Sequence, residues 1–223
     1  MFDRIRQLWK KSLPSEPLDG AVSRWASSQF LRHRMGDGGT YVIEGRLQER
    51  EFRAECGPSR RPYISGMEFR ARVDLALPPV GRVVLMSRAV ASSLRRLDEQ
   101  ETLPRGLEEE VAWLTQLKEA RWDGPDQTFW NCYIVRADEP ELAKRWLNDE
   151  AISFLTLGDS EVAARVPMMV ALMRGKCYLR LEVNPRAEEA DTLLALELLE
   201  QLVDRALALA SGRSRPGGLS SRG

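Results

Sequence analysis

The segment from Gly57 to Gly66 carries the side chains best suited to binding chemistry in this sequence. Arg60 and Arg61 offer planar guanidinium groups that form paired hydrogen bonds with phosphate or carboxylate. Tyr63 adds a ring for stacking, and the neighbouring prolines would hold these groups in place. The segment is about twice as long as a hairpin connection needs. It is our candidate ligand-binding loop; the alternative is a structural crossing in which both arginines pair with nearby glutamates.

Catalytic patterns are incomplete in this sequence. A serine or cysteine nucleophile needs a base beside it, and His33, the only histidine, is expected to cap a helix or lie on the surface. The chain has no GxSxG, Walker A or HExxH motif, and no clustered cysteines and histidines for zinc. Carboxylates such as Asp149 and Glu150 could still pair in space. We therefore predict no catalytic residue, metal or cofactor, and we favour a non-enzymatic protein.

The three cysteines indicate the cellular environment that we expect. Cys56, Cys132 and Cys177 are odd in number, widely separated and each within a predicted strand, where a free cysteine acts as a small apolar residue. The sequence shows no secretory segment, and no apolar run approaches the length of a membrane span. These features predict a reducing, cytoplasmic environment.

The charge balance argues against nucleic acid as a partner. Lys plus Arg and Asp plus Glu both number 33, so the net charge is zero and no global field attracts a polyanion. The polar sides of the predicted strands alternate arginine with glutamate, which is typical of a solvated sheet face. An RNA-binding sheet would expose several aromatic rings, and only Tyr178 qualifies.

Residues 1–13 form a basic amphipathic segment that Pro14 and Pro17 separate from the rest of the chain. Its apolar side includes Phe2, Ile5 and Trp9, whereas Lys10 lies on the basic side with Arg4, Arg6 and Lys11. This helix could dock on the domain or remain frayed, and it could instead bind a membrane surface or a partner.

Periodicity predicts alternating groups of helices and strands along residues 19–117. The cleanest alternation is in residues 67–75, where apolar side chains point one way and charged ones the other. Helices are expected at 19–33, 90–97 and 107–117, and strands at 41–47, 52–56, 67–75 and 82–87.

The stretch from Phe129 to Leu155 is expected to organise the core. Residues 129–135 are β-branched and aromatic on both faces, as in a strand that is covered on both sides. Asp138 is the predicted N-cap of the helix that follows, with Pro140 in its first turn. A hairpin at 168–183, a long apolar helix at 185–210 and a disordered tail at 211–223 complete the chain.

This second half resembles bacterial domains of unknown function. The resemblance is carried by Phe129, Tyr133 and Val135 in a Phe-x-x-x-aromatic-x-Val pattern, by the helix with Asp138, Ala143 and Leu147, and by the hairpin from Val170 to Val183. It covers about a third of the chain. It implies an α+β domain and no particular activity.

The sequence thus predicts an α+β protein with a mostly antiparallel sheet, helices packed on one face and a long hydrophobic C-terminal helix. Residues 1–17 form an N-terminal segment and linker, and residues 18–210 form one domain. The first functional hypothesis is an uncharacterised interaction or accessory protein of the bacterial cytoplasm that binds a protein partner. The C-terminal helix is also a candidate surface for a homodimer. The alternatives are a small anionic-ligand or phosphoester-binding domain that uses residues 57–66, and a peripheral membrane protein anchored by residues 1–13.

Overall fold

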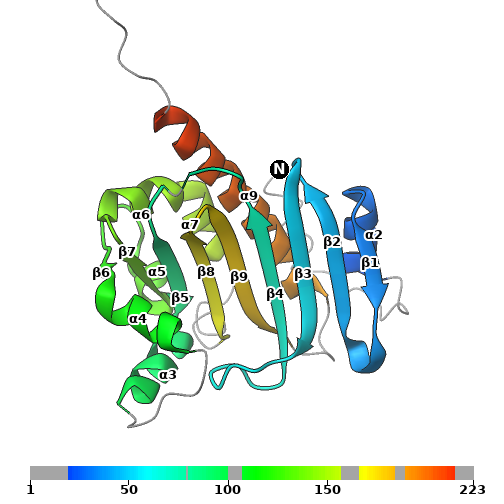
Figure 1. Ribbon diagram of the computed structural model, residues 1–223. Helices are drawn as coiled ribbons and strands as arrows, with labels where there is room; N and C mark the ends of the chain where they lie inside the picture. Colours follow the sequence, from blue (N-terminus) through cyan, green and yellow to red (C-terminus); the bar gives the residue numbers. More distant parts are fainter. Residues whose placement is uncertain (1–19, 79, 100–106, 157–165, 184–188, 214–223) are drawn as a thin grey trace, which may run out of the picture.

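The computed structural model describes residues 20–78, 80–99, 107–156, 166–183 and 189–213. Its centre is one nine-stranded sheet in the order β1-β2-β3-β4-β9-β8-β5-β7-β6, and each neighbouring pair is antiparallel (Figure 1). In chain order the strands are β1 (Arg32–Met35), β2 (Tyr41–Leu47), β3 (Arg50–Pro58), β4 (Met67–Asp74), β5 (Val83–Ser87), β6 (Lys118–Glu119), β7 (Tyr133–Ala137), β8 (Met168–Met173) and β9 (Lys176–Val183).

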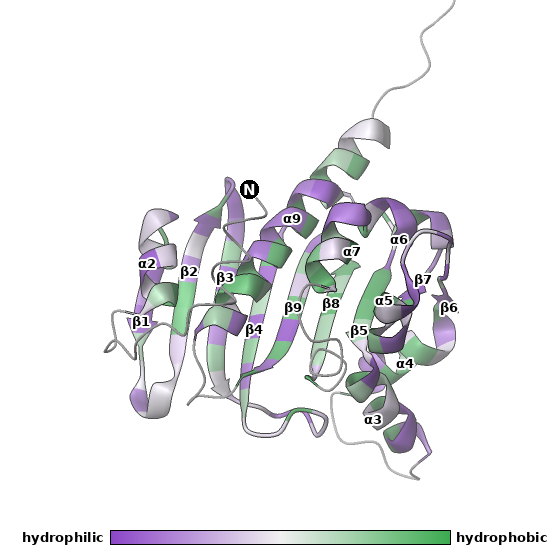
Figure 2. Ribbon diagram, turned by 180° about the vertical axis from the view of Figure 1, so that it is seen from behind, coloured by the Kyte–Doolittle hydropathy of each residue, from purple (hydrophilic) through white to green (hydrophobic). Residues whose placement is uncertain are grey.

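Helices cover one face of the sheet along most of its width (Figure 2). They are α2 (Ala21–Ser28), α5 (Gln127–Cys132), α6 (Pro140–Trp146), α7 (Asp149–Leu155) and the long α9 (Ala190–Arg213), and a short 3₁₀ turn, η1 (Asp37–Gly39), precedes β2. Buried side chains of these helices and of the inner sheet face form the main hydrophobic cluster. The predicted α+β fold with a long C-terminal helix is confirmed.

The opposite, outer face is covered only at one end. There α3 (Arg88–Asp98) and α4 (Glu108–Gln116) bury a second cluster that includes Met86, Ile134 and Met169. Figure 1 shows no described helix in front of β1 to β4. This half of the outer face carries the polar side chains of the alternating strands, such as Arg70 and Arg72 of β4. The sheet therefore presents an open, charged surface beside a helix-covered one.

The helix predicted at residues 19–33 is wrong in its second half. It ends at Ser28, and residues 32–35 form the edge strand β1. Phe30 has a φ of 55° and donates its backbone N–H to the Ser27 carbonyl, which turns the chain. Its side chain is 96% exposed. The helical spacing of apolar residues continues past the end of α2 by coincidence. His33 lies after the turn, in strand β1.

The strand predicted at residues 129–135 is also wrong in its first half. Residues 127–132 form α5, and only Tyr133–Ala137 is a strand. The side chain of Asp126 accepts a hydrogen bond from the backbone N–H of Phe129 at 3.0 Å, which caps the first turn of α5. A run of apolar residues fits a buried helix as well as a buried strand, and the Asp126 cap stabilises the helix here.

Asp138 does not cap α6 as the sequence suggested. Glu139 is the N-cap residue, and Asp138 instead accepts hydrogen bonds from Arg82. The backbone N–H and Nη2 of Arg82 both lie 2.8 Å from this carboxylate. The Arg82 guanidinium holds the pKa of Asp138 below its usual range. The carboxylate thus joins two chain segments that are 56 residues apart.

The chain ends carry predictions that the structure addresses only in part. Residues 1–17 lie outside the described residues. The helix α9 continues to Arg213, beyond the helix end predicted at residue 210. Residues 214–223 of the predicted tail lie outside the described part. Among the described residues, no helix combines the length and apolar character needed to cross a bilayer.

Candidate functional site

Four charged side chains meet where α4 and the 59–66 loop reach the outer face of the sheet. We call this group the buried charge cluster; its members are Arg61 of the loop, Glu68 of β4, Glu110 of α4 and Arg180 of β9. Nη1 of Arg180 lies 2.6 Å from Oε1 of Glu68, and Nη2 of Arg61 lies 3.2 Å from Oε1 of Glu110. Nε of Arg180 lies 3.8 Å from that same Glu110 oxygen.

Both carboxylates of the buried charge cluster are shielded from water. The side chain of Glu68 is 1% exposed and that of Glu110 is 4% exposed. The hydroxyl of Ser59 satisfies the second oxygen of Glu68 at 3.1 Å. Oε2 of Glu110 is buried and makes no hydrogen bond within the described part of the chain. Glu110 is therefore the incompletely paired member.

Burial raises the pKa of Glu110 above its ordinary value, although Arg61 and Arg180 act in the opposite direction. Burial also raises the pKa of Tyr63, whose hydroxyl is buried and has no hydrogen-bond partner among the described residues. Unsatisfied buried polar atoms are rare in folded proteins and mark positions where a further contact is expected. They point to this junction as a candidate site.

The structure places the three residues of the predicted ligand-binding loop in different environments. Arg60 is exposed, Arg61 pairs with Glu110, and Tyr63 is buried at 5% exposure, so its ring offers no open stacking face. The alternative from the sequence, in which loop arginines pair with glutamates, describes Arg61.

Sequence reasoning missed Glu68 and Glu110. Glu68 lies on the polar side of a clearly alternating strand, so nothing in the sequence marked it as buried. Glu110 lies three residues after Leu107 and four before Leu114, on the apolar stripe of its helix. A glutamate in that stripe was a usable signal, because such a position faces the core.

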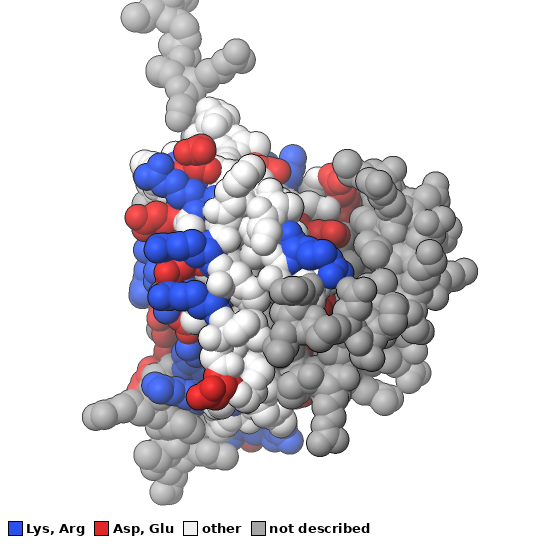
Figure 3. Space-filling model, turned by 90° about the vertical axis from the view of Figure 1, so that its right-hand side faces the viewer, with Lys and Arg blue, Asp and Glu red and all other residues white. Residues whose placement is uncertain are grey.

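A second feature lies beside the buried charge cluster, on the open half of the sheet. Figure 3 shows this half of the sheet from the β1 edge, with the Lys, Arg, Asp and Glu side chains along one side. The second feature is a shallow hollow of about 230 Å³. We call it the arginine hollow. Its polar lining consists of Arg53, Glu55, Arg70, Arg72, Tyr178 and Arg180.

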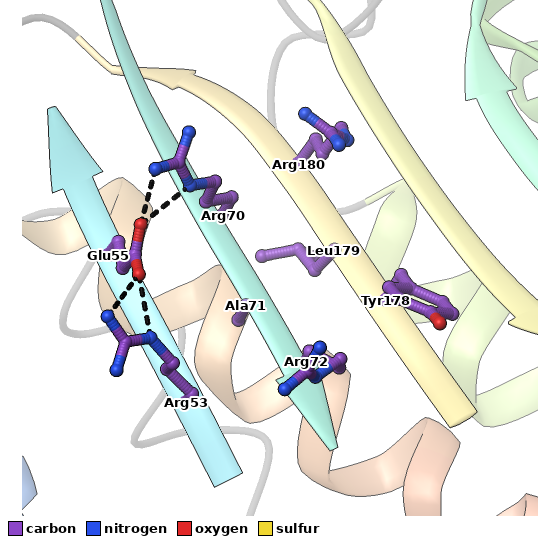
Figure 4. A pocket seen from close by; sticks show the side chains of 8 residues that line it. All are labelled: Arg53, Glu55, Arg70, Ala71, Arg72, Tyr178, Leu179 and Arg180. Carbon is purple, nitrogen blue, oxygen red and sulfur yellow. Dashed lines mark hydrogen bonds and ion pairs between the residues drawn. The ribbon is translucent and has the colours of Figure 1, made fainter. Parts of the chain in front are cut away.

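Glu55 is the one carboxylate in that lining, and two arginines hold it (Figure 4). Nε of Arg53 donates to Oε1 of Glu55 at 2.7 Å, and Nε of Arg70 donates to Oε2 at 2.9 Å. These contacts hold the pKa of Glu55 below its ordinary value, with the hydrogen bonds from Arg70 as the main cause. Arg72 makes no ion pair within the described part of the chain.

The strand register places arginines directly opposite each other in the arginine hollow. Arg53 of β3 faces Arg72 of β4, and Arg70 of β4 faces Arg180 of β9. Like charges directly opposite on neighbouring strands destabilise a sheet. Glu55 offsets this repulsion at Arg53 and Arg70, and Glu68 does so at Arg180, which leaves Arg72 without a carboxylate partner among the described residues.

The other predicted chemistry is spread apart. His33 lies on β1, where its Nδ1 is 3.1 Å from the hydroxyl of Ser23. All three cysteines are buried, and within the described residues none makes a hydrogen bond with His33. No group of three or more His, Cys, Asp or Glu residues in the described part could hold a metal ion. The candidate contact residues Phe2, Ile5, Trp9 and Lys10 lie outside the described residues.

No protein-family model matches this chain, and no curated protein matches it. Among solved structures, it is similar to the crystal structure of the mycobacterial trehalose monomycolate transport factor A, TtfA. The likeness covers 82% of this chain and 90% of that chain, at 12% sequence identity and a TM-score of 0.42. At this level it carries no argument about function.

Proposed function

We propose that this protein is a binding or accessory protein that receives an acidic segment of a partner polypeptide on the open half of its sheet. The observation that carries this proposal is the excess of guanidinium groups in the arginine hollow, where four arginines and one carboxylate form the charged lining, with Arg53 opposite Arg72 and Arg70 opposite Arg180. A carboxylate of the partner would pair with Arg72, which has no carboxylate partner among the described residues, and others would add contacts to its neighbours in the hollow.

The shape of the surface favours an extended partner over a small enclosed ligand. The hollow is shallow, and no described helix lies in front of β3 and β4, which supply three of its four arginines (Figure 1). Its arginines span β3, β4 and β9, and neighbouring strands lie about 4.8 Å apart, so the charged row is about 10 Å wide. A segment with two or more acidic residues matches this row.

A labelled peptide of six glutamates flanked by glycine and serine tests the proposal by fluorescence anisotropy at low salt. We expect Arg72→Glu to weaken binding about ten-fold, and added salt to weaken it further, because the contacts are between charges. Arg72 makes no ion pair in the described structure, so this change should leave stability within about 0.5 kcal/mol.

Lys144→Glu is the matched control, because it makes the same change of charge on α6, which packs against the other face of the sheet. If Lys144→Glu weakens peptide binding as much as Arg72→Glu does, the loss of affinity comes from the change in net charge and not from the arginine hollow. Failure of the wild-type protein to bind the peptide at low salt would remove the proposal.

The peripheral-membrane hypothesis remains a separate proposal based on residues 1–13. Its support is the amphipathic pattern with Phe2, Ile5 and Trp9 opposite a basic side that includes Lys10. Sedimentation with anionic vesicles, compared between the full chain and a chain that begins at residue 18, tests it. Equal sedimentation of both proteins would remove this hypothesis.

A further inference from the structure

A groove of about 130 Å³ runs between α4 and strands β8 and β9, beside the arginine hollow. Met169, Ala171 and Met173 of β8 contribute to it, and Trp113 of α4 and Tyr178 of β9 supply the aromatic side chains. We call it the aromatic groove. Both rings are only partly buried, and they form no ring contact with each other in the described structure. The groove is therefore suited to a planar group.

An ion pair contributes to the lining at each end of the aromatic groove. Arg61 pairs with Glu110 near Arg180, and Arg174 pairs with Glu109 at 2.7 Å beside the β8–β9 turn. Arg61 and Arg174 are thus each matched by a carboxylate of the lining, and Arg180 pairs with Glu68. A cationic group would meet three guanidinium groups, and an anionic group would meet two carboxylates. The occupant that fits best carries no charge.

One residue that lines the groove has an acceptor in need of a donor. Glu110 lines it, and Oε2 of this carboxylate is buried without a hydrogen bond in the described structure. A buried acceptor without a partner is unfavourable, and a donor brought by a ligand relieves it after a small side-chain adjustment. An indole ring combines a planar apolar body with one N–H donor and no charge.

We propose that the aromatic groove binds a tryptophan side chain of the partner segment, with the indole packed against Trp113 and Tyr178 and its N–H directed to Glu110. This inference rests on the proposed binding of an acidic segment and extends it. Tyr178 and Arg180 line both the groove and the arginine hollow, so one continuous segment can occupy both.

The register sets the spacing between the two anchors. Arg72 lies opposite Tyr178, and Tyr178 lies opposite Ala171, so the arginine on β4 and the groove on β8 are two strand spacings apart. That separation is about 10 Å. A tryptophan with acidic residues within about three positions of it in an extended chain satisfies this distance.

Three labelled peptides test the inference on the full chain. They share two glutamates on each side and differ in a central tryptophan, naphthylalanine or alanine. We expect the tryptophan peptide to bind at least ten-fold more tightly than the alanine peptide, and the naphthylalanine peptide, which lacks the N–H, to lose about five-fold relative to tryptophan.

Trp113→Ala should remove most of the gain from tryptophan and leave the affinity for the alanine peptide unchanged, because Trp113 lines the groove and not the arginine hollow. That unchanged affinity also shows that the variant is folded. Equal binding of the tryptophan and alanine peptides to the wild-type protein would overturn the groove assignment alone. Binding of none of the three would instead overturn the proposed function.

Discussion

Arg180 of β9 donates a hydrogen bond to Glu68 of β4 at 2.6 Å, although the sheet register places each of them opposite a residue of its own charge. Glu68 faces Glu182, and Arg180 faces Arg70. The diagonal contact therefore compensates two unfavourable cross-strand pairs. The Glu68 side chain is 1% exposed, so the carboxylate in this contact is shielded from water.

Replacing Glu68 by alanine should destabilise the fold by about 3 kcal/mol, since it leaves Arg180 facing Arg70 without its closest carboxylate. Urea unfolding of wild type and variant at neutral pH measures the difference. The double variant Glu68→Leu/Arg180→Leu should be less destabilised than Glu68→Ala, because it removes both charges. A larger loss in the double variant would contradict this account.

Glu110 should make stability depend on pH in a defined direction. Burial raises its pKa in the folded state above its ordinary value of 4.5. The charges of Arg61 and Arg180 lower this pKa, whereas those of Glu68 and Glu109 raise it, and burial is the largest effect. The folded state thus holds the proton more tightly, so this contribution is complete below pH 4.5 and is lost as the pH rises through the raised pKa.

The variant Glu110→Gln cannot titrate and should lose this component. We expect its unfolding free energy relative to wild type to increase as the pH rises above 4.5, by at most about 1.4 kcal/mol per pH unit. Urea titrations across the acidic to neutral range measure it. The same substitution at exposed Glu150 is the control, and a constant difference between Glu110→Gln and wild type would disprove the prediction.

The β2–β3 turn should be open to stabilisation. Leu47 faces Arg50, so Gln48 and Glu49 form the two-residue turn, with φ values of 50° and 61°. Positive φ at both positions favours asparagine and glycine. Gln48→Asn/Glu49→Gly should raise stability by about 1 kcal/mol in thermal unfolding. Gln48→Ala/Glu49→Ala should give no gain; a gain there would exclude backbone strain as the reason.

All three cysteines should resist modification while the protein is folded. Cys56, Cys132 and Cys177 are buried, and burial raises the pKa of each thiol above its ordinary value. Burial keeps the reagent away from the sulfur, and a raised pKa lowers the fraction of the thiol that is ionised to the reactive thiolate. A disulfide reagent at pH 8 should react slowly with the native protein and titrate three thiols in denaturant. Rapid reaction of one thiol in the native state would show an opening that the structure lacks.

Local pattern was sufficient to predict most of the sheet. The alternation in residues 67–75 predicts β4, and the hairpin expected at 168–183 forms as β8 and β9 around Arg174 and Gly175. Both signals depend on side chains that alternate between a dry and a wet face, which is a property of the strand itself. The long apolar C-terminal helix is predictable for the same kind of reason.

Errors arose where one contact decides between two conformations that the sequence allows equally. Asp126 caps a helix where the apolar run from Phe129 suggested a strand, and the turn at Phe30 ends a helix whose period continues beyond it. Asp138 lies at the start of a helix, but Arg82, 56 residues away, holds its carboxylate. Such choices depend on partners that no local window contains.

Local pattern identifies strands such as β2, β3 and β4 and the alternation of their side chains, because hydrophobic alternation acts over neighbouring positions. Which of the many arginines and glutamates meet is set by tertiary contacts. Glu68 and Glu110 are distant in sequence, yet pairing of β4 with β9 and packing of α4 over the sheet bring both to Arg180. Burial of a charge depends on what covers it, and that is fixed by the fold.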